Sequence, residues 1–206
     1  MIEQAIPNHE EELARLAEIG TAGFVIGFGL RFGQPDFFLN RYPEAWTKKY
    51  EEENYFFGDP VAAWTIARTG AIRWSELTFP DIRNVMPEAA KHGLIYGATV
   101  VTKVGRKRSF MSLARPDREM TDAEMEYLHA QIQLWARLFA RSHVALSEGE
   151  IDVLRLMRDG LTQGEAAEQL GISTSTVKFR LNSAQKKFGT NRTANVLARA
   201  ARQNII

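Results

Sequence analysis

The C-terminal third of the chain carries a series of helix signals that constrain its fold more than any other feature. Ser147 with Glu150, and Thr162 with Glu165, form capping boxes, in which hydroxyl and carboxylate satisfy the free backbone N–H groups of a helix start. A tight turn at residues 171–173 follows the second helix. The next helix carries one apolar stripe, at i, i+4, i+7 and i+11: Val177, Leu181, Ala184 and Phe188. With a fourth helix expected from about residue 191 or 193, this segment is predicted to be a small all-helical domain containing a helix-turn-helix.

Charge is unevenly distributed along the chain, although the formal net charge is only +1. Residues 146–206 contain nine Lys or Arg and six Asp or Glu, and residues 171–206 contain seven basic residues and no acidic one. Clustered cations without interspersed anions are typical of a protein that binds the phosphate backbone. A solvated helix face, which is the alternative, usually mixes the two signs. The charge therefore favours nucleic acid, and a helix-turn-helix predicts double-stranded DNA as the partner.

The outer face of the helix after the turn is the predicted DNA-reading surface. Its start carries three short hydroxyls that suit phosphate contacts: Thr174, Ser175 and Thr176. One turn further, Lys178 can donate to guanine, Phe179 can touch a thymine methyl group and Asn182 can pair with adenine. Thr162, at the start of the preceding helix, and Lys186 complete the predicted DNA-binding residues.

The spacing of these residues resembles the C-terminal domain of LuxR-type transcription regulators. The similar positions span nearly all of residues 146–206: Leu146-Ser147-x2-Glu150-x2-Val153-Leu154, Gly160-x-Thr162-x2-Glu165-x-Ala167, Leu170-x-Ile172-Ser173-x2-Thr176-Val177-Lys178, Lys187-Phe188 and Asn191-Arg192. Two residues depart from the family pattern: Ala166, where Ile is usual, and Arg180, where His is frequent. Neither disturbs the expected architecture, and Arg180 adds a cation near the backbone.

Predicted helices and strands are interspersed in the N-terminal part of the chain. Helices are expected at residues 10–20, 43–53 and 121–141, and strands at residues 24–28 and 37–39. Residues 99–114 alternate around Val104-Gly105-Arg106, which indicates an antiparallel hairpin. The predicted fold class is an α+β domain, an antiparallel sheet with helices on both faces, followed by the small all-α domain. The expected bounds are residues 1–141 for the first domain, 142–146 for a short linker and 147–206 for the DNA-binding domain.

Aromatic residues, several with an N–H or O–H group, are concentrated in the middle of the first domain: Trp46, Tyr50, Tyr55, Phe56, Phe57, Trp64 and Trp74. Trp46 and Tyr50 lie at i and i+4, so the indole N–H and the phenol O–H share one helix face. An apolar pocket with a few fixed donors and acceptors suits a small amphiphilic ligand, and Asp59 would be its one carboxylate. The alternative is that these rings form an ordinary core and that Asp59, before a proline, starts a turn.

The same segment resembles the autoinducer-binding domain of the quorum-sensing LuxR-type receptors, in the pattern Trp46-x3-Tyr50-x8-Asp59-Pro60 with Trp74 and Gly97 following. Those receptors recognise N-acyl-homoserine lactones. The resemblance implies that Trp46 donates to the lactone carbonyl, Asp59 accepts the amide N–H and Tyr50 donates to the amide carbonyl. It also implies that Trp74 lines the head-group pocket and that a strand hydroxyl, assigned to Ser112, assists. The likeness covers most of residues 10–140, and the departures are a short chain and Val101, where Pro is common.

The chemistry of an acyl lactone agrees with these residues. The ligand carries two carbonyl acceptors and one amide donor, whereas Trp46 and Tyr50 supply two donors and Asp59 supplies one acceptor. The ligand-binding set also includes Tyr55. The acyl tail needs an apolar slot, for which the expected lining is Val25, Ile26, Phe28, Phe38, Val100 and Met111.

Two apolar stripes run along the helix predicted at residues 121–141. The first is heptad-like and comprises Met125, Leu128, Ile132, Trp135 and Phe139, and the second comprises Tyr127, Leu134 and Leu138. If one stripe packs on the sheet, the other can pair with a second copy, so a homodimer that reads paired half-sites is expected. The alternative is that both stripes belong to the core. The short linker suggests that ligand controls the placement of the DNA-binding domains.

Catalysis is disfavoured by the absence of any recognisable motif. The four histidines are isolated and the chain has no cysteine, so no catalytic residue, metal site or cofactor is expected, and an enzyme acting on the lactone is disfavoured. The longest uncharged stretch, residues 19–30, is too short for a membrane helix, and the first residues lack a secretory signal. We therefore expect a cytoplasmic regulator, with contact to RNA polymerase left open. The alternative function is a ligand-independent LuxR-type protein that acts by heterodimerisation with another regulator.

Overall fold

The computed structural model describes residues 2–31, 33–142, 146–202 and 205–206. The chain divides into two compact units, Met1–Ser142 and His143–Ile206, and each is described by itself. Of the predicted linker, Ser142 is the last residue of a helix, and residues 143–145 lie outside the described part of the chain. None of the helices in the described residues is long and apolar enough to cross a membrane.

A five-stranded antiparallel sheet forms the centre of the N-terminal unit, with the strand order β2-β1-β5-β4-β3. The strands are β1 (Gly23–Leu30), β2 (Phe37–Asn40), β3 (Gly70–Arg73), β4 (Tyr96–Val104) and β5 (Lys107–Arg115). The predicted hairpin is confirmed, because β4 and β5 pair antiparallel up to Val104 and Lys107. The register aligns Thr99, Ser112, Val25 and Asn40 across four strands, and it aligns Val101, Phe110, Gly27 and Phe38 two residues away.

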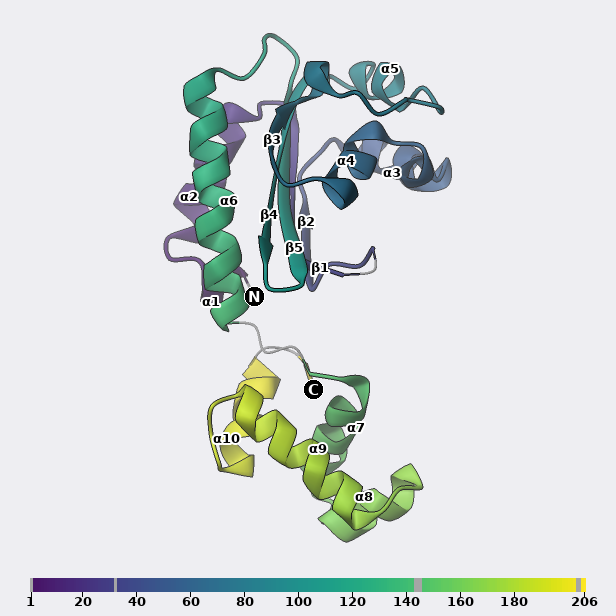
Figure 1. Ribbon diagram of the computed structural model, residues 1–206, viewed down its shortest axis with the longest axis vertical. Helices are drawn as coiled ribbons and strands as arrows, with labels where there is room; N and C mark the ends of the chain where they lie inside the picture. The colour runs from purple at the N-terminus through teal and green to yellow at the C-terminus, as the bar shows by residue number, and fades with distance from the viewer. Residues whose placement is uncertain (1, 32, 143–145, 203–204) are drawn as a thin grey trace. The chain divides into compact units, whose positions relative to one another are not determined.

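Helices cover both faces of this sheet, as the predicted fold class requires (Figure 1). One face carries α1 (Ile2–Ala5), α2 (His9–Ile19) and the long α6 (Asp122–Ser142). The other face carries α3 (Glu44–Glu52), α4 (Pro60–Ala67) and α5 (Val85–Ala90), with short 3-10 turns η1 (Tyr55–Phe57) and η2 (Trp74–Glu76) between them.

The two faces have separate cores because side chains alternate along a strand with a period of two. Phe24, Ile26 and Phe28 of β1 pack with Met111 and Leu113 of β5 in the cluster that α6 covers. On the opposite face, Trp46, Tyr55, Trp74, Val85, Ala89, Leu94 and Ala114 form a smaller cluster. The second face leaves room for a cavity.

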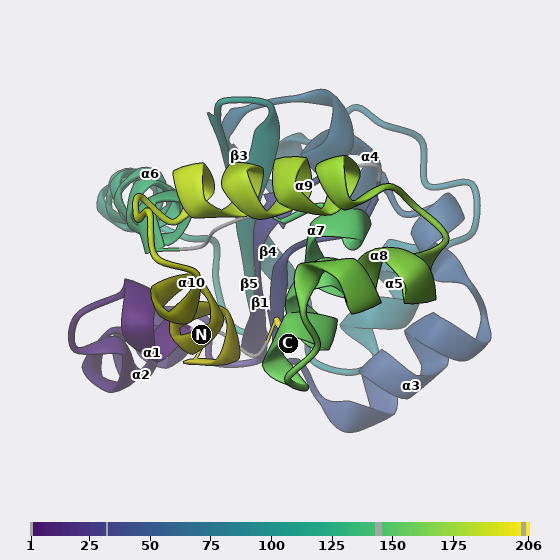
Figure 2. The same cartoon turned by 90° about the horizontal axis from the view of Figure 1, so that it is seen from below.

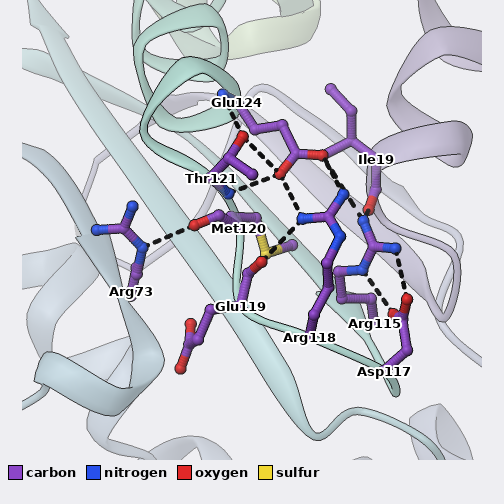
Figure 3. A network of polar contacts seen from close by, with 9 residues as sticks. All are labelled: Ile19, Arg73, Arg115, Asp117, Arg118, Glu119, Met120, Thr121 and Glu124. Atoms are coloured by element: carbon purple, nitrogen blue, oxygen red, sulfur yellow. Dashed lines mark hydrogen bonds and ion pairs between the residues drawn. The ribbon is translucent and has the colours of Figure 1, made fainter.

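A network of charged side chains fastens the start of α6 to the sheet (Figure 3). Glu124 and Thr121 form a capping box, and both nitrogens at the tip of Arg118 donate to the Glu124 carboxylate, at 2.7 and 2.8 Å. Arg115, buried at the end of β5, pairs with Asp117 and donates to the carbonyl of Ile19 at 3.2 Å. This network therefore joins the ends of α2, β5 and α6.

Four helices form the C-terminal unit, as predicted: α7 (Glu148–Arg158), α8 (Gln163–Leu170), α9 (Thr174–Lys187) and α10 (Thr193–Arg202). The capping boxes at Ser147/Glu150 and Thr162/Glu165 are both present. The predicted stripe of α9 is buried in the core of this unit, where α9 packs against α7 and α8 (Figure 2).

Candidate functional site

A cavity of about 580 Å³ lies on the face of the sheet that α3, α4 and α5 cover. Five of the six predicted ligand-binding residues line it: Trp46, Tyr50, Asp59, Trp74 and Ser112. The structure thus brings together side chains from α3, the start of α4, η2 and β5. Cavities of this size commonly enclose small organic ligands.

Asp59 is positioned by its role as the N-cap of α4. Its Oδ1 accepts the backbone N–H of Val61 at 2.7 Å, and Pro60 occupies the first position of the helix, where its fixed φ is favourable. The Tyr50 hydroxyl donates to Oδ2 of Asp59 at 2.7 Å. Burial raises the pKa of Asp59, while the hydrogen bonds from Tyr50 and the backbone oppose that rise. Asp59 therefore presents an oriented carboxylate to the cavity, and Glu51 is a second acidic residue of the lining.

Trp74 and Ser112 belong to a second chain of hydrogen bonds. The Trp74 indole N–H donates to the Thr99 hydroxyl at 3.0 Å, and the Thr99 and Ser112 hydroxyl oxygens lie 2.7 Å apart. The indole lies flat against Gly97, where an added Cβ would come within 2.2 Å of the Trp74 ring. A glycine at position 97 is therefore required for this ring position. Thr99, which the sequence analysis did not select, fixes both Trp74 and Ser112.

Tyr42 is a cavity residue that the sequence analysis missed. Its hydroxyl is buried and has no hydrogen-bond partner among the described residues. Burial raises the pKa of Tyr42, and the nearby Ser112 hydroxyl opposes that rise. A buried hydroxyl without a partner is costly and marks a place where a ligand atom is expected. The available signal was its spacing, because Tyr42 precedes Trp46 by four residues.

Tyr55 does not line the cavity. Its ring is buried and stacks on Trp46, with ring centroids 5.8 Å apart, and it meets Tyr50 edge-on. Arg83 lies over the same ring. Tyr55 thus supports the position of Trp46 from behind.

Most of the predicted tail-lining residues are placed wrongly. Val25 and Phe38 do line the cavity, but four residues are packed in the opposite core, beneath α6: Ile26, Phe28, Val100 and Met111. Neighbouring residues of a strand face opposite sides, so Val25 and Ile26 cannot line one slot. Besides Val25 and Phe38, the apolar walls include Leu30, Pro35, Val61, Ala62, Ile66 and Phe110.

The first predicted stripe of α6 packs on the sheet. Met125, Leu128, Ile132, Trp135 and Phe139 are all buried against the sheet. The second stripe is more accessible: Tyr127 and Leu138 are half-buried, and 50% of Leu134 is exposed. This second stripe is the part of α6 that remains available for a partner.

The outer face of α9 is accessible along its length. Seven of the eight predicted DNA-binding residues are exposed, namely Thr162, Thr174, Ser175, Lys178, Phe179, Asn182 and Lys186, whereas Thr176 is half-buried. Phe179, the large apolar side chain of this face, is 72% exposed.

Two of the basic side chains near α9 are engaged within the unit. Lys187 pairs with the buried carboxylate of Glu150 at 2.6 Å, and Arg180 donates to the carbonyl of Gly149 at 3.4 Å. Their loss would therefore affect folding as well as any DNA contact. Lys178 and Lys186 are the cleaner choices for testing phosphate or base contacts.

The described residues contain no cluster of three or more His, Asp or Glu side chains that could hold a metal ion. The lining of the cavity combines hydrogen-bonding groups with apolar side chains. It can hold a small ligand that has a polar head and an apolar tail.

Comparisons with known proteins follow this division of the chain. A family model described as an autoinducer binding domain matches residues 10–142, and one described as bacterial regulatory proteins of the luxR family matches residues 144–200. The HTH-type quorum-sensing regulator RhlR of Pseudomonas aeruginosa is 29% identical, over 80% of this chain and 74% of the relative. The regulatory protein SdiA of Escherichia coli is also 29% identical, over 96% of this chain and 89% of the relative. The crystal structure of Escherichia coli SdiA is similar, with a TM-score of 0.53 and 25% identity over 100% of this chain and 92% of that chain.

Proposed function

Because the chain belongs to the luxR family of bacterial regulatory proteins and has an autoinducer-binding domain, we propose that it is a transcription regulator controlled by an N-acyl-homoserine lactone. The lactone binds in the cavity of the N-terminal unit. Operator DNA binds to the outer face of α9.

The observation that carries the choice of ligand is the arrangement of free and occupied polar groups in the cavity. Tyr50 already donates to Asp59, so its hydroxyl proton is engaged. The Tyr42 hydroxyl is buried without a described partner, so Tyr42 rather than Tyr50 is the donor to the amide carbonyl. Asp59 accepts the amide N–H, and Trp46 donates to the lactone carbonyl. A ligand with two acceptors and one donor matches this set, and an unmatched buried group would cost about 1–3 kcal/mol.

Thr99 and Ser112 support the same head group from the sheet. Their hydroxyls are linked to each other and to Trp74, which fixes the wall against which the ring of the lactone packs. This activity needs no catalytic group, metal or cofactor, so the protein acts by binding alone.

DNA recognition is assigned to α9. Thr174, Ser175 and Thr176 contact phosphates at the helix start, where the backbone N–H groups also favour an anion. Lys178, Phe179 and Asn182 meet base edges in the major groove, whereas Thr162 and Lys186 contact the flanking backbone. The protein acts in the cytoplasm as a homodimer on paired half-sites, and the second stripe of α6 is available to contribute to the dimer.

The decisive experiment is the melting temperature of the full chain with and without N-acyl-homoserine lactones. A ligand that binds only the folded protein stabilises it by RT ln(1 + [L]/Kd), about 2.7 kcal/mol at a hundredfold excess over Kd. We expect a rise of several degrees that Asp59→Asn abolishes, because Asn retains the N-cap but removes the charge.

Asp36→Asn is the matched control, since Asp36 is a carboxylate of the same unit that pairs with Lys107 outside the cavity lining. It should leave the lactone-dependent rise intact. A folded wild-type protein that shows no rise with any lactone would overturn the proposal and favour regulation by a protein partner.

A further inference from the structure

Gly27 and Phe110 form an unusual contact on the floor of the cavity. They are paired across β1 and β5, and the Phe110 ring lies over the glycine, where an added Cβ would come within 2.2 Å of the ring. Gly27 is buried, and Phe110 lines the cavity. The missing side chain at position 27 therefore lets a large ring lie low against the sheet. Any side chain at this position would push the ring toward the cavity space.

The cavity continues beyond this ring. Val25, beside Ser112 in the register, marks the polar end, and Leu30 at the end of β1 also lines the cavity. The five residue steps between them span roughly 15 Å, slightly less than the usual strand rise gives, because the register of β1 shifts between Gly27 and Leu30. On the opposite wall, the cavity follows α4 from Asp59 at its N-cap to Ile66, a rise of about 10 Å. Both walls thus describe an elongated apolar channel that begins at the polar groups.

The far end of the channel reaches the surface at Ile66, which lines the cavity and is 47% exposed. Phe38, paired with Gly27 in the register, lines the cavity at the level of the Phe110 ring and is 54% exposed. A fully extended chain advances about 1.2 Å per bond, because one backbone residue spans about 3.6 Å over three bonds. Walls of about 10 and about 15 Å therefore hold a tail of about eight to twelve carbons between the polar end and this rim.

We propose that the ligand carries a long unbranched acyl tail of about eight to twelve carbons, and that Gly27 and Phe110 together set this preference. This inference rests on the proposed lactone-binding function. The tail lies across the Phe110 ring, and carbons beyond the rim reach solvent and add little to binding.

The test is a series of unsubstituted N-acyl-homoserine lactones with tails from about four to about fourteen carbons, measured by equilibrium binding to the full chain. Each carbon buried in the channel should tighten binding roughly two- to fourfold, and the gain should level off beyond about twelve carbons. Gly27→Ala should raise the ring and weaken the longest tails by about tenfold or more, with little change for the shortest tails.

A second variant separates an effect on the ring from a general loss of folding. In Gly27→Ala/Phe110→Ala, no ring remains to be displaced, so long-tail binding should recover toward the level of Phe110→Ala alone. Gly164→Ala is the matched control, since an added Cβ there meets no atom closer than 3.9 Å, and it should leave the chain-length profile unchanged.

The possible outcomes also separate the two proposals. The inference would be overturned, while lactone binding stands, if lactones with four- or six-carbon tails bound most tightly. It would also be overturned if the double variant lost as much affinity for long-tailed lactones as Gly27→Ala does. Failure of wild-type protein to bind any lactone would instead overturn the proposed function, and the inference with it.

Discussion

At the scale of single residues, two tyrosines that line the cavity, Tyr42 and Tyr50, have different roles. Tyr50 is bonded to Asp59, whereas Tyr42 is buried with its hydroxyl free among the described residues. Removing the Tyr50 hydroxyl should therefore lower the stability of the unliganded protein, whereas removing the Tyr42 hydroxyl should leave that stability unchanged or slightly raised.

Tyr42→Phe and Tyr50→Phe form a matched pair that tests this difference. Tyr42→Phe should leave the melting temperature of the unliganded protein unchanged or slightly raised, because no internal hydrogen bond is lost. It should weaken lactone binding by about tenfold or more, because a carbonyl loses its donor. Tyr50→Phe should lower the melting temperature itself. If Tyr42→Phe left lactone affinity unchanged, the assignment of Tyr42 as the carbonyl donor would be wrong.

The pKa of Asp59 adds a dependence on pH. Burial raises this pKa, so ionisation of Asp59 costs stability as pH rises through the raised value, and the carboxyl takes up a proton more readily on acidification. The ligand amide N–H favours the charged form, so lactone affinity should fall with decreasing pH, beginning above the range of an ordinary Asp. Calorimetric titration of the protein with lactone across this pH range measures the change in affinity. Tyr50 and Asp81 are the other side chains that influence the pKa of Asp59. A lactone affinity that stays constant with pH across this range would contradict this prediction.

Residue-level prediction from the sequence worked where a motif fixes the position. Trp46, Tyr50, Asp59 and Trp74 were selected by their spacing, and all line one cavity. The hydroxyls of Tyr42 and Thr99 were missed, because only the folded sheet and the start of α3 bring them to the same space.

At the scale of secondary-structure elements, local signals predicted α2, α3, α6 and the four C-terminal helices, but they missed α1, α4 and α5 and assigned the strand faces poorly. The capping boxes predicted at Ser147/Glu150 and Thr162/Glu165 are both present, since a box depends on residues only three positions apart. The expected lining of the tail channel failed because it combined residues of both parities on β1 with Val100 and Met111, which face the other core, whereas each strand sends alternate residues to opposite faces. Which parity faces the cavity depends on where α6 packs, and that is a property of the tertiary fold.

The charged network at the start of α6 predicts a measurable acid dependence (Figure 3). The hydrogen bond from Arg118 lowers the pKa of Glu124 to about 2, well below the ordinary value of a glutamate. A lowered pKa stabilises the fold above the unfolded value, and this contribution is lost as pH falls through about 4 toward 2. Glu124→Gln should therefore lower the melting temperature at neutral pH, and the difference from wild type should narrow on acidification. Glu126→Gln, exposed on the same helix, is the control and should have little effect at any pH. A difference that stays constant between about pH 7 and pH 3 would refute the electrostatic role of Glu124.

The exposed face of α9 yields a prediction on DNA. Phe179→Ala should leave the melting temperature nearly unchanged, because the side chain is 72% exposed, and yet weaken binding to a duplex selected from a random pool. Lys186→Ala should weaken binding to all duplexes similarly and reduce the salt dependence by about one counterion. Fluorescence anisotropy at several salt concentrations measures both. Unchanged affinity of Phe179→Ala would place the DNA-reading surface elsewhere.

At the scale of the whole molecule, the chain consists of two units that each have their own core and their own candidate site. A regulator requires that occupancy of the cavity alters DNA binding. The connection is short, since α6 ends at Ser142 and the capping box of α7 begins at Ser147.

Lengthening this connection tests whether it carries the coupling. A flexible Gly/Ser insertion between residues 142 and 146 should leave lactone affinity unchanged but bring the DNA affinities with and without lactone closer together. The same insertion in the exposed turn at Gly105 and Arg106 is the control. If the inserted chain responded to lactone as fully as wild type, the linker would have no part in the coupling.

The most direct test of the central claim is the affinity of the full chain for its selected duplex, measured with and without the lactone that raises the melting temperature most. The account predicts that saturating lactone changes the Kd for DNA by about tenfold or more, and that Asp59→Asn abolishes the change while the variant still binds DNA. Equal affinity in the presence and absence of a lactone that demonstrably binds would contradict the claim that this chain is a lactone-controlled regulator.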